Sequence, residues 1–343
     1  MTRLGICLTG GGISGAAFQI GALAALHDAG VRGFDVHVGV GAGASVAAGL
    51  ACGASVERLY RAFLDPADDY FSLERRHILD LDTEALGRAG AALVRALRHG
   101  AASFVGKAPV PASVLEELDR LYDVLPPGLF SLEAYEQFFG ECLFRRGLPS
   151  GFSALATTLL LPAYDIDSGE RIVFGRAPLA HVPIPRAVCA ASAMPLFHTP
   201  VQVGDRFFLS GTTGAVAHVD VALSAGAESV LVLNPLVTHK LGGAVPTGHG
   251  RRRSLRDKGM MAIFDQAIRI AATRRFDERI GLLGDAASRV VVLSADPSFA
   301  SLFLASPGDT KSRRELLEHA YRTTRDRVPE LLHDHPEFAR GGG

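Results

Sequence analysis

Leu4-Gly5-Ile6-Cys7-Leu8-Thr9-Gly10-Gly11-Gly12-Ile13-Ser14-Gly15 opens the chain with a short apolar run that passes into closely spaced glycines. An apolar run of this length, ended by glycines, is typical of a buried parallel strand. Residues 15–29 are then mostly apolar and are followed by Gly30, which predicts a helix. This order of strand, glycine loop and helix gathers backbone N–H groups at a helix N-terminus, where they can hold an anion.

The same order repeats directly afterwards. Residues 36–40 predict a second strand, and residues 46–52 predict a helix of small residues that ends at Gly53. Two such units in succession are typical of a doubly wound α/β sheet. We expect further strands at 152–158, 171–174, 206–209, 230–234 and 289–293, and helices at about 260–283 and 311–333.

Residues 54–150 follow a different pattern. Charged and apolar residues alternate there at helical spacing, which predicts a helical insertion with helices at 56–63, 83–98, 113–122 and 132–145. Residues 242–259 are rich in Gly, Pro and Arg and predict a mobile basic loop. We therefore expect a single domain over residues 1–335, with a flexible tail at 336–343.

Composition excludes several classes of protein. The 343 residues are 48% hydrophobic and 21% charged, which is enough for a large core. A formal net charge of -1 gives no basic field for a nucleic-acid partner. The sequence shows neither a leader pattern nor an apolar run of about 18 residues, so we expect a cytoplasmic protein. No metal or cofactor is predicted, because the cysteines lack metal or redox spacing and read as buried free thiols: Cys7, Cys52, Cys142 and Cys189.

The glycines also fit the dinucleotide fingerprint G-x-G-x-x-G at Gly10, Gly12 and Gly15. That fingerprint needs an acidic residue at the end of the second strand to hold a ribose. The second strand here runs into Gly41-Ala42-Gly43 with no acid, which disfavours dinucleotide binding.

Five stretches, in order, resemble the patatin-like phospholipases. They are T-G-G-G-I-S-G from residue 9, V-G-A-G-A-S from 40, L-L-L-P-A-Y-D from 159, A-S-A-M-P-L-F from 191 and L-S-G-T from 209. The resemblance implies a three-layer α/β/α fold with a mainly parallel central sheet. It also implies lipid acyl hydrolysis by a serine nucleophile and an aspartate base, with the glycine loop as the oxyanion hole.

Carried onto this chain, the resemblance places Gly43 at the nucleophile position and Ser210 at the base position. The oxyanion loop survives as Gly10, Gly11, Gly12 and Gly15, and Ser14, which replaces a usually basic residue of the family, joins them in the expected anion-binding set. Glycine cannot form an acyl-enzyme, and serine cannot act as a carboxylate base. Loss of such a unit costs on the order of 10⁶ in turnover. No catalytic residue is therefore intact, and the sequence predicts a pseudoenzyme.

Three residues are candidates to rescue catalysis: Ser45, His198 and His218. Two residues along a helix turn a side chain by about 200°, and serine is a preferred helix cap, so we interpret Ser45 as a cap that points away from the loop. The two histidines flank the base region and could line the pocket. We interpret His37 as a core residue and Asp220 as a helix cap.

The function expected from these residues is a lipid acyl hydrolase homologue that binds an acyl or lipid ligand without cutting it, or that regulates a partner. One alternative is an active acyl-ester hydrolase or acyltransferase that uses Ser45 or a histidine. Another is an enzyme that needs only the oxyanion hole. The basic run at 251–258 leaves peripheral membrane contact open, and a protein partner or homo-oligomer also stays open.

Overall fold

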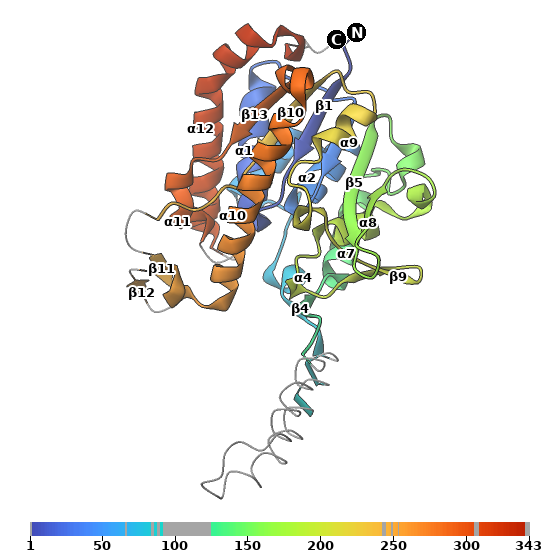
Figure 1. Ribbon diagram of the computed structural model, residues 1–343, viewed down its shortest axis with the longest axis vertical. Helices are drawn as coiled ribbons and strands as arrows, with labels where there is room; N and C mark the ends of the chain where they lie inside the picture. Colours follow the sequence, from blue (N-terminus) through green and yellow to red (C-terminus); the bar gives the residue numbers. More distant parts are fainter. Residues whose placement is uncertain are drawn as a thin grey trace, which may run out of the picture.

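The computed structural model describes residues 2–65, 67–83, 86–87, 90–91, 125–241, 245–247, 250–252, 254–304 and 309–339. Within them, the centre is an eight-stranded sheet of order β13-β10-β1-β2-β5-β9-β8, with β6 paired to β5 (Figure 1). The five strands from β13 to β5 are parallel, and the others are antiparallel. The strands are β1 (Leu4–Leu8), β2 (Val36–Gly39), β5 (Thr158–Asp165), β6 (Arg171–Phe174), β8 (Val201–Val203), β9 (Arg206–Ser210), β10 (Ser229–Asn234) and β13 (Val290–Ser294).

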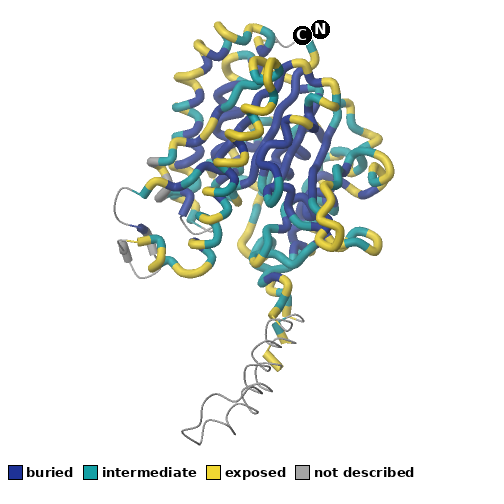
Figure 2. Tube along the Cα trace, in the orientation of Figure 1, coloured by how far each residue is buried: buried dark blue, intermediate teal, exposed yellow. Residues whose placement is uncertain are grey.

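The sheet separates two hydrophobic cores. Side chains alternate across each strand, so Ile6 of β1 joins one core while Cys7 joins the other. The larger core contains α1 (Gly12–Asp28), α2 (Ala42–Ala51), α3 (Val56–Leu64), α7 (Glu133–Phe144), α8 (Ile184–Ser192), α11 (Ala300–Phe303) and α12 (Thr310–Asp334). The smaller core lies under α9 (Val219–Ser224) and α10 (Met260–Gly281). The chain therefore has the three-layer α/β/α fold that the sequence predicted, with the strands buried in the middle (Figure 2).

A second, smaller sheet lies beside the main one. It is formed by β3 (Asp80–Leu81), β4 (Gly128–Ser131) and β7 (Leu196–His198), and the one-turn helix α4 (Arg75–Ile78) precedes it. Of the helices expected in the insertion, α3 and α7 are confirmed. All of the helix expected at 113–122 and most of the one expected at 83–98 lie outside the described residues.

Two local expectations are wrong. Residues 152–158 do not form a strand: a 3-10 turn occupies Phe152–Ala154, and β5 begins only at Thr158. The first residues of the supposed tail are also not free, because Phe338 is fully buried in the larger core. The fold therefore continues beyond residue 335, while residues 340–343 of the predicted tail lie outside the described residues.

The described part of the basic segment forms local structure. β11 (Val245–Thr247) pairs antiparallel with β12 (Gly250–Arg252), and a 3-10 turn follows at Leu255–Lys258. The prediction of a mobile loop also covers 242–244, 248–249 and 253, which lie outside the described residues.

The four cysteines are free, as predicted, and three of them are buried while Cys142 is half-buried. Burial raises the pKa of the Cys7 and Cys189 thiols, so both stay neutral. Of the helices described, none has both the length and the apolar content needed to cross a membrane.

We predict that Phe338→Ala destabilises the whole domain. Removal of a fully buried phenylalanine leaves a cavity and costs about 3–5 kcal/mol. Phe144→Ala is the matched control, because that side chain is 85% exposed and its loss changes stability by less than about 0.5 kcal/mol. Urea denaturation measures both free energies of unfolding, and equal effects of the two changes would refute the anchoring role of Phe338.

Candidate active site

The glycine loop follows β1 directly and is fixed by buried polar contacts. Gln19 Nε2 donates to Thr9 O at 2.6 Å, and Thr9 Oγ1 donates to Asn234 Oδ1 at 3.0 Å. Gly11 has φ 117° and Gly12 has φ 65°, a left-handed backbone that favours glycine. Gly11 precedes α1 without any side-chain cap, so N–H groups of the first turn remain available to an anion.

A second turn joins β2 to α2 at Gly41. This residue has φ 57° and ψ -137°, and α2 begins immediately after it. Residues of α8 hold the turn, because Gly41 N donates to Ala191 O and Ser192 Oγ donates to Gly41 O, both at 2.8 Å. Gly41 is therefore the apex of a sharp strand-to-helix turn.

The family resemblance put Gly43 at the nucleophile position, but Gly43 does not lie at this apex. That prediction is wrong. A Cβ atom on Gly43 would lie 2.2 Å from Leu8 O and 2.5 Å from Thr9 O. Its side-chain direction therefore runs into the backbone at the end of β1 and not into the site. The helix begins at Ala42, four residues earlier than predicted, which shifts the residue at the apex by two positions.

The space in front of Gly41 is closed. A Cβ atom on Gly41 would lie 2.8 Å from Gly10 Cα and 3.4 Å from Thr212 Cγ2. A Cβ atom on Gly10 would lie 2.7 Å from the same Thr212 methyl. Gly10, Gly41 and Thr212 thus pack against one another, and a hydroxymethyl group at the apex would need the glycine loop to move.

Ser210 lies in the same hydrogen-bond network. Its hydroxyl donates to Ala191 O at 2.8 Å, the carbonyl that also accepts from Gly41 N. Ser210 Oγ also accepts from Thr212 N at 3.3 Å and so caps a 3-10 turn at Gly211–Thr213. The side chain is buried, and its hydroxyl oxygen also lies 3.0 Å from Thr212 Oγ1.

The predicted cap at Ser45 is wrong, and Ser14 is not a cap either. Ser45 is the fourth residue of α2, while Ser14 is the third residue of α1, and glycines occupy both N-cap positions. Both serines line the cavity described below. Ser45 Oγ accepts from the Tyr135 hydroxyl at 2.7 Å, and burial raises the pKa of Tyr135, so this phenol stays neutral. Ser45 thus faces a hydrogen-bond donor and not a base.

The two candidate histidines occupy different surroundings. His198 lines the cavity; its Nδ1 accepts from Met194 N at 3.3 Å, and its Nε2 is buried without a hydrogen-bond partner. His218 instead donates from Nε2 to Gly211 O at 3.1 Å and accepts at Nδ1 from Arg171. Burial lowers the pKa of each imidazole to about 4, so both are neutral at neutral pH.

His37 and Asp220 are the other two residues interpreted from the sequence. His37 is a buried core residue on β2, as predicted, although its Nδ1 has no hydrogen-bond partner. Asp220 is not the predicted helix cap: His218 is the N-cap of α9, and Asp220 is the second residue of the helix. Asp220 instead pairs with Arg171 through both carboxylate oxygens, at 3.2 and 2.7 Å.

A largely apolar cavity of about 350 Å³ opens from the glycine loop and the Gly41 turn. Aromatic and aliphatic side chains from α3, α7 and the segment between them form most of its wall. The lining includes Ile13, Ser14, Ser45, Leu59, Phe63, Phe71, Leu73, Tyr135, Phe139, Leu143, Met194, Phe197, His198, Ser210, Thr212, Phe264 and Phe303. The charged side chains among the described lining residues are Arg146, Asp265 and Arg269.

One comparison with known proteins identifies the family of this chain. The family model described as patatin-like phospholipase matches residues 6–224, which include both turns and Ser210. Among solved structures, the chain is similar to VipD from Legionella pneumophila, with 13% sequence identity and a TM-score of 0.42 over 97% of this chain and 67% of that one. A search of curated proteins finds no match. Because the family model covers more than half of its length, the chain belongs to the patatin-like phospholipase family.

We predict that Gly43→Ala costs at least about 2 kcal/mol of stability, because the new methyl group meets the backbone carbonyls of Leu8 and Thr9. Gly49→Ala in the same helix is the control. Its new methyl would lie 3.8 Å from Ala54 Cβ, and alanine favours a helix over glycine by up to about 1 kcal/mol. Denaturant titration of both variants provides the measurement; a tolerated Gly43→Ala would show that the site is looser than described.

Proposed function

We propose that this patatin-like chain is a non-hydrolytic member of its family that binds an acyl or lipid ligand in its apolar cavity. The observation that carries the proposal is the closed turn at Gly41, where the Gly10 backbone and the Thr212 methyl fill the space of a nucleophile side chain. We assign the family's nucleophile position to Gly41 and its base position to Ser210.

Neither position supplies the chemistry of ester cleavage. Gly41 has no side chain to attack a carbonyl, and Ser210 cannot take a proton as a carboxylate would. Loss of a nucleophile–base unit costs on the order of 10⁶ in turnover. A glycine loop that still stabilises an oxyanion leaves a reaction rate roughly 10³-fold above the uncatalysed rate in water, which is too slow for useful lipase activity.

The cavity supports binding. Ligand pockets are usually concave, mostly apolar and about 300–1,000 Å³ in volume, and this one measures about 350 Å³. An acyl chain can lie along the aromatic wall formed by residues such as Phe63, Phe71 and Phe139. The uncapped N-terminus of α1 also lines the cavity.

The alternative catalysts receive less support. Ser45 lacks a base, because its described partner is the neutral Tyr135 hydroxyl. His218 is committed to Gly211 O and Arg171. His198 is neutral and lines the cavity, but Gly41 offers no serine hydroxyl from which this histidine could take a proton.

We predict that the purified protein hydrolyses acyl esters no faster than heat-denatured protein, on both short and long acyl chains. Ser45→Ala, His198→Ala and His218→Ala should leave this background unchanged. Turnover above the denatured control that disappears in one of these variants would refute the proposal and identify the residue responsible.

We further predict that hydrolysis can be restored only by a combined change. Gly41→Ser and Ser210→Asp supply the nucleophile and base, and Thr212→Gly removes the methyl that packs against Gly10. The triple variant should release p-nitrophenol from an acyl ester at a measurable rate, whereas Gly41→Ser alone should not. Activity of Gly41→Ser without the change at Thr212 would contradict the closed geometry.

A further inference from the structure

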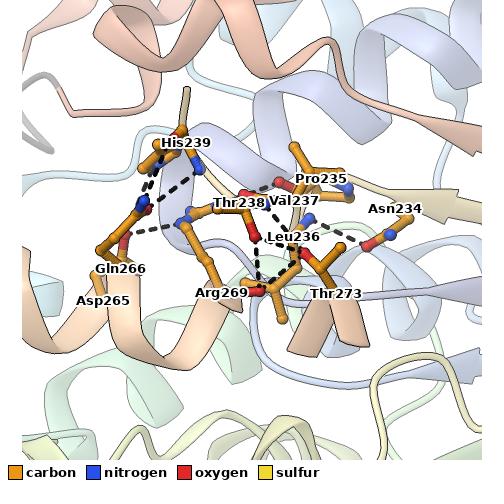
Figure 3. Close-up of polar contacts among 10 residues, drawn as sticks. All are labelled: Asn234, Pro235, Leu236, Val237, Thr238, His239, Asp265, Gln266, Arg269 and Thr273. Carbon is orange, nitrogen blue, oxygen red and sulfur yellow. Dashed lines mark hydrogen bonds and ion pairs between the residues drawn. The ribbon is translucent and has the colours of Figure 1, made fainter. Parts of the chain in front are cut away.

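A buried arginine stands in the cavity wall outside the part of the chain that the family model matches. Arg269 belongs to α10, has only 2% of its surface exposed and lines the cavity together with Asp265. Figure 3 shows the two side chains projecting from α10 toward the segment that follows β10. Burial of a guanidinium is costly unless charged or polar partners surround it.

The partners fix the position of the guanidinium. Arg269 Nε donates to Asp265 Oδ2 at 2.7 Å, and Nη1 donates to the carbonyls of Pro235 and Val237 at 3.0 and 3.4 Å. Its Cζ lies 5.5 Å from the centre of the Phe303 ring. The side chain is therefore preorganised, and a ligand would not have to order it.

Pro235 connects this arginine to the glycine loop. Pro235 Cγ would lie 3.5 Å from a Cβ atom on Gly11 and 3.3 Å from one on Gly15. The carbonyl of the same proline accepts from Arg269. Arg269 and the uncapped N-terminus of α1 thus both contact Pro235 and both line the cavity, and each favours negative charge beside it.

Two further titratable groups surround the arginine. Burial alone would raise the pKa of Asp265, but Arg269 and His239 hold it at about 2, so the carboxylate is charged at neutral pH. His239 Nε2 lies 3.6 Å from Asp265 Oδ2, and burial lowers the pKa of this imidazole, which keeps it neutral. The carboxylate balances the guanidinium when the cavity is empty, so it also opposes an incoming anion.

We propose that Arg269 and the glycine loop form a subsite for a compact anionic head group, carboxylate or phosphate, on a single acyl chain whose tail lies in the apolar cavity. Asp265 sets the strength of this subsite by partial neutralisation of Arg269. The inference rests on the proposed function and adds the class of ligand to it.

The test compares three ligands with the same tail: dodecanoate, dodecyl phosphate and dodecanol. Calorimetric titration of the full chain should show both anions, or one of them, binding at least about tenfold more tightly than the alcohol, as a desolvated charge pair implies. Binding of one anion alone assigns the head group to carboxylate or phosphate. Equal affinity for all three ligands would overturn the subsite but leave the proposed function intact.

Two variants test whether Arg269 and Asp265 cause the preference for anions over the alcohol. Asp265→Asn removes the opposing charge, so the affinity for the preferred anion should rise on the order of tenfold while that for dodecanol stays within about twofold. Arg269→Gln should abolish the preference for anions. The controls on the same helix are Asp277→Asn and Arg274→Gln, both exposed, which should change neither affinity.

The outcomes are distinguishable. If Arg269→Gln does not fold, Asp265→Asn still tests the subsite. A pair with a purely structural role would lower the thermal midpoint of unfolding in this variant, but it would leave the ratio of anion affinity to alcohol affinity unchanged. An unchanged ratio in Asp265→Asn would overturn the proposal. If none of the three ligands binds, the proposed function fails, and this inference fails with it.

Discussion

The close approach of three backbone segments at the carboxyl ends of β1 and β2 is the constraint on which the rest of the site depends. α2 packs so tightly against β1 that Gly43 leaves no room for a methyl group before Leu8 O. Gly39 meets the same limit, because a Cβ atom there would lie 2.5 Å from Gly43 O. Only glycine allows this packing, and it brings the Gly41 turn against the glycine loop. In open α/β sheets, ligands bind at this edge, beyond the carboxyl ends of the strands.

The sequence predicted the layers of the fold but not the exact turn. Apolar runs that end in glycine identified β1 and β2, and the five family stretches identified the three-layer architecture, which is confirmed. The site depends on register, however, and Gly39, Gly41 and Gly43 are spaced by two residues. The sequence can therefore be aligned with the turn in more than one register. Backbone direction decides between them, because a helix that starts at Ala42 turns Gly43 toward β1 and Ser45 toward the cavity.

Other parts of the site could not be read from the sequence because they depend on contacts between distant segments. Thr212 is only the last residue of one family stretch in the sequence, yet its methyl group is what packs against Gly10. Arg269 appeared as one of several charges on a predicted helix, and its burial follows from carbonyls that turn toward it after β10. Phe338 was predicted to lie in a flexible tail, although its side chain is fully buried in the larger core. No local pattern distinguishes these residues from surface residues.

The arrangement around Gly41, Ser210 and Thr212 is stable in its own right. A carboxylate at position 210 would be buried beside Ala191 O, an acceptor that repels it, and its charge would be costly to bury. A serine there donates to that carbonyl, accepts from Thr212 N and leaves no charge to compensate. Gly41 likewise accepts the left-handed backbone of the turn without strain. The three positions therefore support one another: the absence of a side chain at Gly41 permits the Thr212 methyl to pack on the glycine loop, and the neutral Ser210 holds Thr212 in place. Such mutual support favours a rigid, preorganised cavity, a property that serves the binding of a ligand as well as it would serve catalysis.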